Sequence, residues 1–60
     1  MIIKIKKERK EYQYSQYKKG WELEVVNDYG EYYTAIVRKG CDRNYHNTCL
    51  AVHKKDCSVI

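Results

Sequence analysis

Residues 21–38, WELEVVNDYGEYYTAIVR, decide the fold of this chain. In 21–26 apolar side chains alternate with glutamates, which predicts a strand with one buried face. Residues 27–30, Asn-Asp-Tyr-Gly, favour a tight turn because Asn, Asp and Gly tolerate left-handed backbone conformations. Residues 31–38 are rich in β-branched and aromatic side chains, which predicts the return strand of a hairpin.

The flanking segments extend this β pattern in both directions. Isoleucine and lysine alternate over residues 2–7, which predicts a short strand. Residues 8–19 are polar and rich in tyrosine and indicate a long loop or an irregular hairpin; a helix over 6–19 lacks an apolar stripe unless the tyrosines supply one. The remaining expected elements are a polar loop at 39–47, a strand at 48–53, one 3₁₀ turn at 54–57 and a terminal strand at 58–60.

Sixty residues allow one domain, residues 1–60, with a small core and marginal stability. There are seven tyrosines and no phenylalanine, and tyrosine can fill a core edge while its hydroxyl stays in water. The expected core is Ile3, Ile5, Trp21, Leu23, Val25, Tyr33, Ala35, Val37, Leu50, Val52, Val59 and Ile60.

The order of these elements resembles that of the SH3-like small β-barrels. Residues 30–35, Gly-Glu-Tyr-Tyr-Thr-Ala, are similar to the Gly-acidic-aromatic-aromatic-x-Ala run of that family, and residues 50–57 are similar to its penultimate strand and 3₁₀ turn. The resemblance implies an all-β, five-stranded SH3-like barrel with one 3₁₀ turn near the C-terminus. Tyr32 stands where the family has a tryptophan and His53 where it has a proline, so the resemblance does not imply a proline-rich ligand.

Charge is unevenly distributed along the chain. Residues 1–19 carry a net charge of +5, residues 20–37 a net charge of −4 and residues 38–60 a net charge of +3. A basic N-terminal third could attract an acidic protein or a phosphate backbone, although lysine runs are often ordinary solvated surface. The chain has no apolar stretch of membrane-spanning or signal-peptide length, so we expect a cytoplasmic protein.

Three cysteines and two histidines gather in the last third of the chain. In a reducing cytosol the cysteines are expected to be free thiols, and Cys57 suits a buried position. The five side chains could also supply zinc ligands, although no Cys-x2-Cys knuckle is present. This alternative is a zinc-stapled small domain with ligands drawn from Cys41, His46, Cys49, His53 and Cys57.

The sequence favours binding over catalysis, and we expect no cofactor. A cysteine beside a histidine could form a nucleophilic pair, but no orienting third group or Gly-rich oxyanion loop accompanies it, and so small a domain has little room for a water-excluding pocket. We therefore expect a protein that is not an enzyme.

Interleaved tyrosine and basic side chains mark the expected binding surface. Such residues can anchor a protein interface or stack on bases and neutralise phosphates. The expected surface consists of Arg9, Lys10, Tyr12, Tyr14, Tyr17, Lys18, Lys19, Tyr29 and Tyr32. The AT-rich codons of the frequent residues suggest a bacteriophage or mobile-element protein that binds and modulates or inhibits a host protein, host defence proteins included. A nucleic-acid-binding barrel is the alternative.

Overall fold

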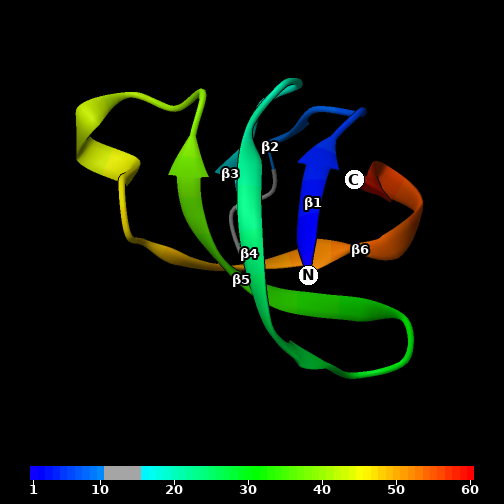
Figure 1. Cartoon of the computed structure of the whole chain (residues 1–60). Helices are drawn as coiled ribbons and strands as arrows, with labels where there is room; N and C mark the ends of the chain where they lie inside the picture. The colour runs from blue at the N-terminus through cyan, green and yellow to red at the C-terminus, as the bar shows by residue number, and fades with distance from the viewer. Residues whose placement is uncertain (11–15) are drawn as a thin grey trace.

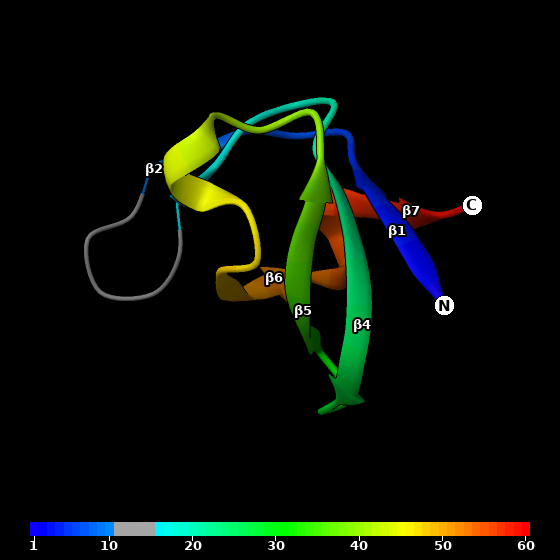
Figure 2. The same ribbon diagram turned by 60° about the vertical axis from the view of Figure 1, so that its left-hand side comes forward.

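The computed structural model describes residues 1–10 and 16–60, which form an all-β protein. Its longest strands are β4 and β5, and they form the long hairpin seen in Figures 1 and 2. The elements in chain order are β1 (Ile2–Ile5), β2 (Arg9–Lys10), β3 (Gln16–Tyr17), β4 (Glu22–Asp28), β5 (Tyr32–Lys39), the 3₁₀ turn η1 (Arg43–Tyr45), β6 (Cys49–His53), the 3₁₀ turn η2 (Lys54–Asp56) and β7 (Cys57–Val59).

Five strands form one antiparallel sheet in the order β6-β5-β4-β1-β7, and β2 pairs with β3 in a separate two-stranded ribbon. The strands, the β4–β5 turn and η2 confirm the elements expected from the sequence. The ribbon shows that the described part of 8–19 takes the hairpin alternative. Strand pairing among the described residues does not join β6 to β7, so the sheet is open.

An apolar row across three strands organises the core. Ile3 of β1 pairs with Leu23 of β4, which in turn pairs with Val37 of β5, and all three side chains are fully buried. Each such side chain contributes about 1.5–3 kcal/mol of hydrophobic stabilisation. The same face of the sheet buries Ile5, Trp21, Tyr33, Ala35, Val52 and Cys57, with Val25 and Leu50 partly buried beside them.

Two of the residues expected in the core are on the surface. Val59 and Ile60 are 59% and 68% exposed. They lie at the end of β7, which is an edge strand of the sheet, so no further strand covers them although Val59 pairs with Ile3. Conversely, Tyr17 was expected on the binding surface but is 1% exposed and belongs to the core.

Gly40 allows two segments to approach closely beside Trp21. A Cβ atom at Gly40 would lie 2.9 Å from the Gly20 carbonyl oxygen and 3.3 Å from the Trp21 Cα, and the φ of Gly40 is +80°. Gly30 is the matched control because its φ is +92° but a Cβ there would meet nothing within 4 Å.

We expect Gly40→Ala to lower the free energy of unfolding by roughly 2–3 kcal/mol and Gly30→Ala by about 1–2 kcal/mol. Both variants carry the cost of a left-handed backbone, but only the Gly40 variant adds a clash with backbone atoms. Urea denaturation of both variants measures the difference. Equal losses would show that the backbone contact between Gly40 and Gly20 is unimportant.

Candidate functional site

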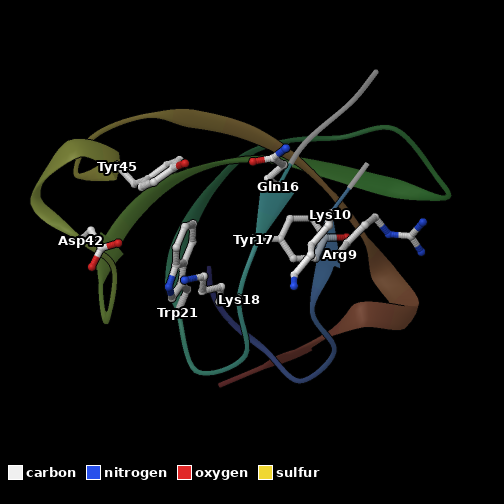
Figure 3. A pocket seen from close by; sticks show the side chains of 8 residues that line it. All are labelled: Arg9, Lys10, Gln16, Tyr17, Lys18, Trp21, Asp42 and Tyr45. Carbon is white, nitrogen blue, oxygen red and sulfur yellow. The ribbon is translucent and has the colours of Figure 1, made fainter. Parts of the chain in front are cut away.

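A pocket opens between the β2–β3 ribbon and the loop that carries η1 (Figure 3). Its volume is about 120 Å³. The residues that line it come from three segments distant in the sequence: Arg9, Lys10, Gln16, Tyr17, Lys18, Trp21, Asp42 and Tyr45. The structure thus brings the ribbon, the start of β4 and the β5–β6 loop together around one hollow.

One wall of the pocket is an aromatic pair. The rings of Trp21 and Tyr45 lie 5.1 Å apart between centroids at an interplanar angle of 46°. Trp21 is buried because it precedes Leu23 in the alternation of β4, which places it on the core face. Tyr45 is half-buried at the end of η1 and packs against the core. This wall is therefore aromatic and packed against the core.

The opposite wall is held by a buried carboxylate. Asp56 of η2 is fully buried, and its Oδ2 accepts hydrogen bonds from Arg9 Nε at 2.8 Å and from the Tyr17 hydroxyl at 2.6 Å. The Tyr17 hydroxyl also accepts a bond of 3.4 Å from the His53 backbone N–H. Asp56 therefore ties the ribbon to the turn between β6 and β7, and it fixes two residues of the pocket wall without lining the pocket itself.

These contacts shift the pKa values of Asp56 and Tyr17. Burial alone would raise the pKa of Asp56, but the hydrogen bonds from Arg9 and Tyr17 and the charge of Arg9 outweigh burial, so this pKa lies below its ordinary value of 3.8. Burial, together with the hydrogen bond to Asp56, raises the pKa of Tyr17 to about 12. At neutral pH the cluster therefore holds an ionised carboxylate, a guanidinium and a neutral phenol.

Protein stability should fall at both ends of the pH range. Because Tyr17 has a higher pKa folded than unfolded, its contribution is complete below the unfolded value of 10.0 and is lost as pH rises through about 12. Because the pKa of Asp56 is depressed on folding, its contribution is complete above 3.8 and is lost as pH falls through the folded value. Thermal unfolding measured against pH tests both expectations. The variant Tyr17→Phe should lose less stability at alkaline pH than the wild type. If its alkaline loss of stability were unchanged, Tyr17 could not be the source of that loss.

Basic side chains line the pocket and lie on segments next to it. Lys10 and Lys18 lie on its rim, with Asp42 as the acidic residue among the described lining; Lys10 is 77% exposed and reaches Glu8 at 3.8 Å. The Gly20 N–H donates to the Ile5 carbonyl at 2.8 Å, and Gly40 lies against Gly20, so segments 5–7, 18–20 and 39–40 meet at this end. These segments add four exposed lysines: Lys6, Lys7, Lys19 and Lys39.

The expected binding residues divide between this pocket and the far turn of the β4–β5 hairpin. Arg9, Lys10, Tyr17 and Lys18 line the pocket, and Lys19 is exposed next to it. Tyr12 and Tyr14 lie outside the described residues.

Tyr29 and Tyr32 belong to that far turn, where their rings stack 5.1 Å apart at 18°. They are 55% and 37% exposed. Lys54 lies nearby, in an ion pair of 2.8 Å with Asp28 and 4.8 Å from the centre of the Tyr33 ring. The structure therefore places these two tyrosines apart from the pocket, because the length of the hairpin separates its turn from the ribbon (Figure 2).

Four lining residues were not predicted as binding residues: Gln16, Trp21, Asp42 and Tyr45. Trp21 was assigned to the core, which is correct, but one side of it also forms the pocket wall. Tyr45 offered a signal, because an aromatic residue within a polar loop is unusual unless it packs or binds something.

The structure does not assemble the hypothetical zinc ligands. Cys57 is buried in the core, Cys49 is exposed on β6 and Cys41 is half-buried. Among residues 1–10 and 16–60, which include all five candidates, no group of three or more His, Cys, Asp or Glu side chains could hold a metal ion. Alternation along β6 places Cys49 and His53 on one face, but Cys57 turns inward beyond η2.

The buried thiol is also a poor candidate for a nucleophile. Cys57 Sγ lies 3.6 Å and 3.7 Å from the carbonyl oxygens of His53 and Lys54. Burial, with the neighbouring charge of Asp56, raises the pKa of Cys57, so the thiol is protonated and weakly reactive at neutral pH. Cys57 is not among the residues that line the pocket, whose lining consists of aromatic, basic, amide and carboxylate side chains.

Comparison with known proteins finds no matching family model, no matching curated protein and no matching solved structure. Within the part of the chain that the structure describes, no helix has the length and apolar character needed to cross a bilayer. The geometry and electrostatics of the pocket are thus the basis for assigning a function.

Proposed function

We propose that this protein is a non-enzymatic protein-binding module that acts by occupying a partner's surface through the pocket and its basic surroundings. The observation that carries the proposal is the pocket's size and setting. At about 120 Å³ it is well below the roughly 300–1,000 Å³ of sites that enclose small-molecule ligands. It can hold one side chain of a larger partner, while the lysines around it contact the partner's surface.

The proposed framework is an SH3-like small barrel with an open seam. Two features support it: the ribbon inserted between β1 and β4, and the 3₁₀ turn η2 between the last two strands. This is the element order of that family. With the compositional hint of a phage or mobile element, the framework makes a host protein the first partner class to test.

A protein partner is favoured over nucleic acid because the exposed aromatic rings lie apart from the lysines around the pocket. Non-specific single-strand binders combine a positive groove with aromatic platforms on which bases stack. In the described part of this chain, Trp21 and Tyr17 beside the lysines are 5% and 1% exposed, so they offer no open face on which successive bases could stack, and the pocket beside them has room for one ring. The exposed pair Tyr29 and Tyr32 lies instead at the hairpin turn with Asp28 and Glu31.

Affinity capture from the lysate of the host cell, with and without nuclease, tests this function. We expect one protein to be retained after nuclease treatment and to be lost with the double variant Lys10→Glu/Lys18→Glu. The matched control is Lys4→Glu/Lys55→Glu, which changes the net charge equally at exposed sites outside the pocket lining. Capture that disappears with nuclease, or that yields nucleic acid alone, would favour the nucleic-acid-binding barrel.

A further inference from the structure

We infer that the pocket receives a single-ring aromatic side chain from an acidic peptide segment of the partner, with the segment's carboxylates on either side paired to Lys10 and Lys18. This inference rests on the proposed protein-binding function and names the chemistry of the partner. It concerns the pocket between the β2–β3 ribbon and η1 and makes no use of the far turn of the β4–β5 hairpin.

The size of the pocket selects the inserted group. An apolar cavity of about 150 Å³ is known to hold one benzene molecule. A pocket of about 120 Å³ that is open on one side therefore matches a single ring and is too small for an indole and its neighbours together. A methyl or a short aliphatic side chain would leave part of this volume without contacts, which loses dispersion energy.

The walls of the pocket suit an aromatic ring. Trp21 and Tyr45 meet at 46°, and tilted or offset arrangements are those that aromatic rings prefer. Figure 3 shows Tyr17 and Gln16 on the opposite side of the hollow. A ring entering from the solvent side would thus have aromatic neighbours on both sides. The amide of Gln16, which also lines the pocket, supplies a donor and an acceptor for the backbone of the segment that carries the ring.

The charge around the mouth selects the residues that flank the ring. Lys10 and Lys18 stand on the rim, and Lys19, Lys39 and Lys6 belong to the segments that meet at the same end. An acidic segment is drawn to the exposed cations of the rim, Lys10 and Lys18. Rim charges act mainly on association rate and specificity, whereas the buried ring supplies the anchor.

The structure is preorganised for this role, since neither wall must be assembled on binding. Asp56 holds Arg9 and Tyr17 in place by hydrogen bonds of 2.8 Å and 2.6 Å, and Gly40 lets the start of β4 and the β5–β6 loop approach closely. Side chains that are already ordered lose little entropy on binding. A short peptide can therefore bind measurably without the rest of its protein.

Selection from a displayed library of short random peptides tests the inference, with the purified full chain as bait. The chain has one tryptophan, Trp21, so quenching or a spectral shift of its fluorescence reports directly on the pocket. We expect the enriched peptides to contain one phenylalanine or tyrosine flanked by Asp or Glu. Replacing that ring by alanine, or two flanking acids by their amides, should each weaken binding by about tenfold or more.

The protein variants distinguish the possible outcomes. Lys10→Glu/Lys18→Glu should weaken binding of the selected peptide at least about tenfold, while Lys4→Glu/Lys55→Glu and Tyr29→Ser leave it nearly unchanged. Enriched peptides without an acidic and aromatic pattern, or binding that resists the pocket variant, would overturn the inference and leave a protein-binding role at another surface. Failure to enrich any peptide would also overturn the inference. The proposed protein-binding function itself would be rejected only if the lysate capture yielded no protein that is retained after nuclease treatment.

Discussion

The variant Asp56→Ala is expected to lose a large part of the free energy of unfolding of this protein. Removing one partner of a buried charged pair costs about 3–5 kcal/mol, because the other groups lose their partner and stay out of water. A domain of sixty residues has a total stability of roughly 3–9 kcal/mol. Asp56 is fully buried and accepts bonds from both Arg9 and Tyr17, so this single side chain accounts for a large share of that total.

Circular dichroism and urea denaturation measure the effect, with two further variants for comparison. Asp42→Ala removes an exposed carboxylate and should change stability little. Asp56→Asn keeps one acceptor oxygen for Tyr17 and loses the charge opposite Arg9, so its stability should fall between those of the wild type and Asp56→Ala. If Asp56→Ala were as stable as Asp42→Ala, the buried cluster could not be what holds the β2–β3 ribbon in place.

Trp21→Ala is expected to have an effect of similar size, about 3–5 kcal/mol, because it removes a large buried side chain and leaves a cavity that the sheet cannot collapse to fill. Trp21 is 5% exposed and contacts the ring of Tyr45. The same substitution enlarges the pocket and removes the Trp21 half of its aromatic wall. Both stability and peptide binding should therefore be lost.

Two milder variants separate these effects. Trp21→Phe keeps an aromatic ring in the core and should lose less stability. Tyr45→Ala removes the exposed half of the aromatic wall, so it should weaken peptide binding while most molecules stay folded, as measured by circular dichroism and by calorimetric titration. Peptide affinity that survives Tyr45→Ala would show that the wall formed by Trp21 and Tyr45 does not contact the ligand.

The β4–β5 hairpin was the most predictable element of the fold. Its strands alternate with a period of two, and its turn contains Asp28, whose side chain accepts a bond of 2.9 Å from the Gly30 N–H. These signals are local, so they are readable from a short window of sequence. The 3₁₀ turn η2 and the strand β6 were predicted for the same reason.

The buried cluster could not be predicted from local pattern. Asp56 lies in a polar segment with Lys54 and Lys55, which is typical of solvated surface, yet it is fully buried because Arg9 and Tyr17 reach it from far along the chain. Tyr17 likewise lies among polar residues, and only the docking of the ribbon covers it. Contacts separated by so many residues leave no periodic signal.

The pocket was predictable only in part. Its cations were identified from the basic N-terminal third, but Tyr45 and Asp42 come from a loop whose position depends on η1 and on the close approach at Gly40. The stacked pair Tyr29 and Tyr32 shares the composition of a binding surface and lies at the other end of the hairpin. Composition identified the residue types, whereas topology determined which of them meet.

A heteronuclear NMR titration of the labelled chain with an acidic aromatic peptide, run in parallel with an oligothymidylate at low salt, shows which residues each ligand contacts. We expect the peptide to shift the Trp21 indole signal and the amide signals of Lys18 and Tyr45 and to leave those of Tyr29 and Tyr32 in place. The oligonucleotide should leave the pocket signals unchanged. Peptide shifts centred on Tyr29 and Tyr32, or pocket shifts produced by the oligonucleotide alone, would show that the pocket is not a site for an acidic aromatic peptide.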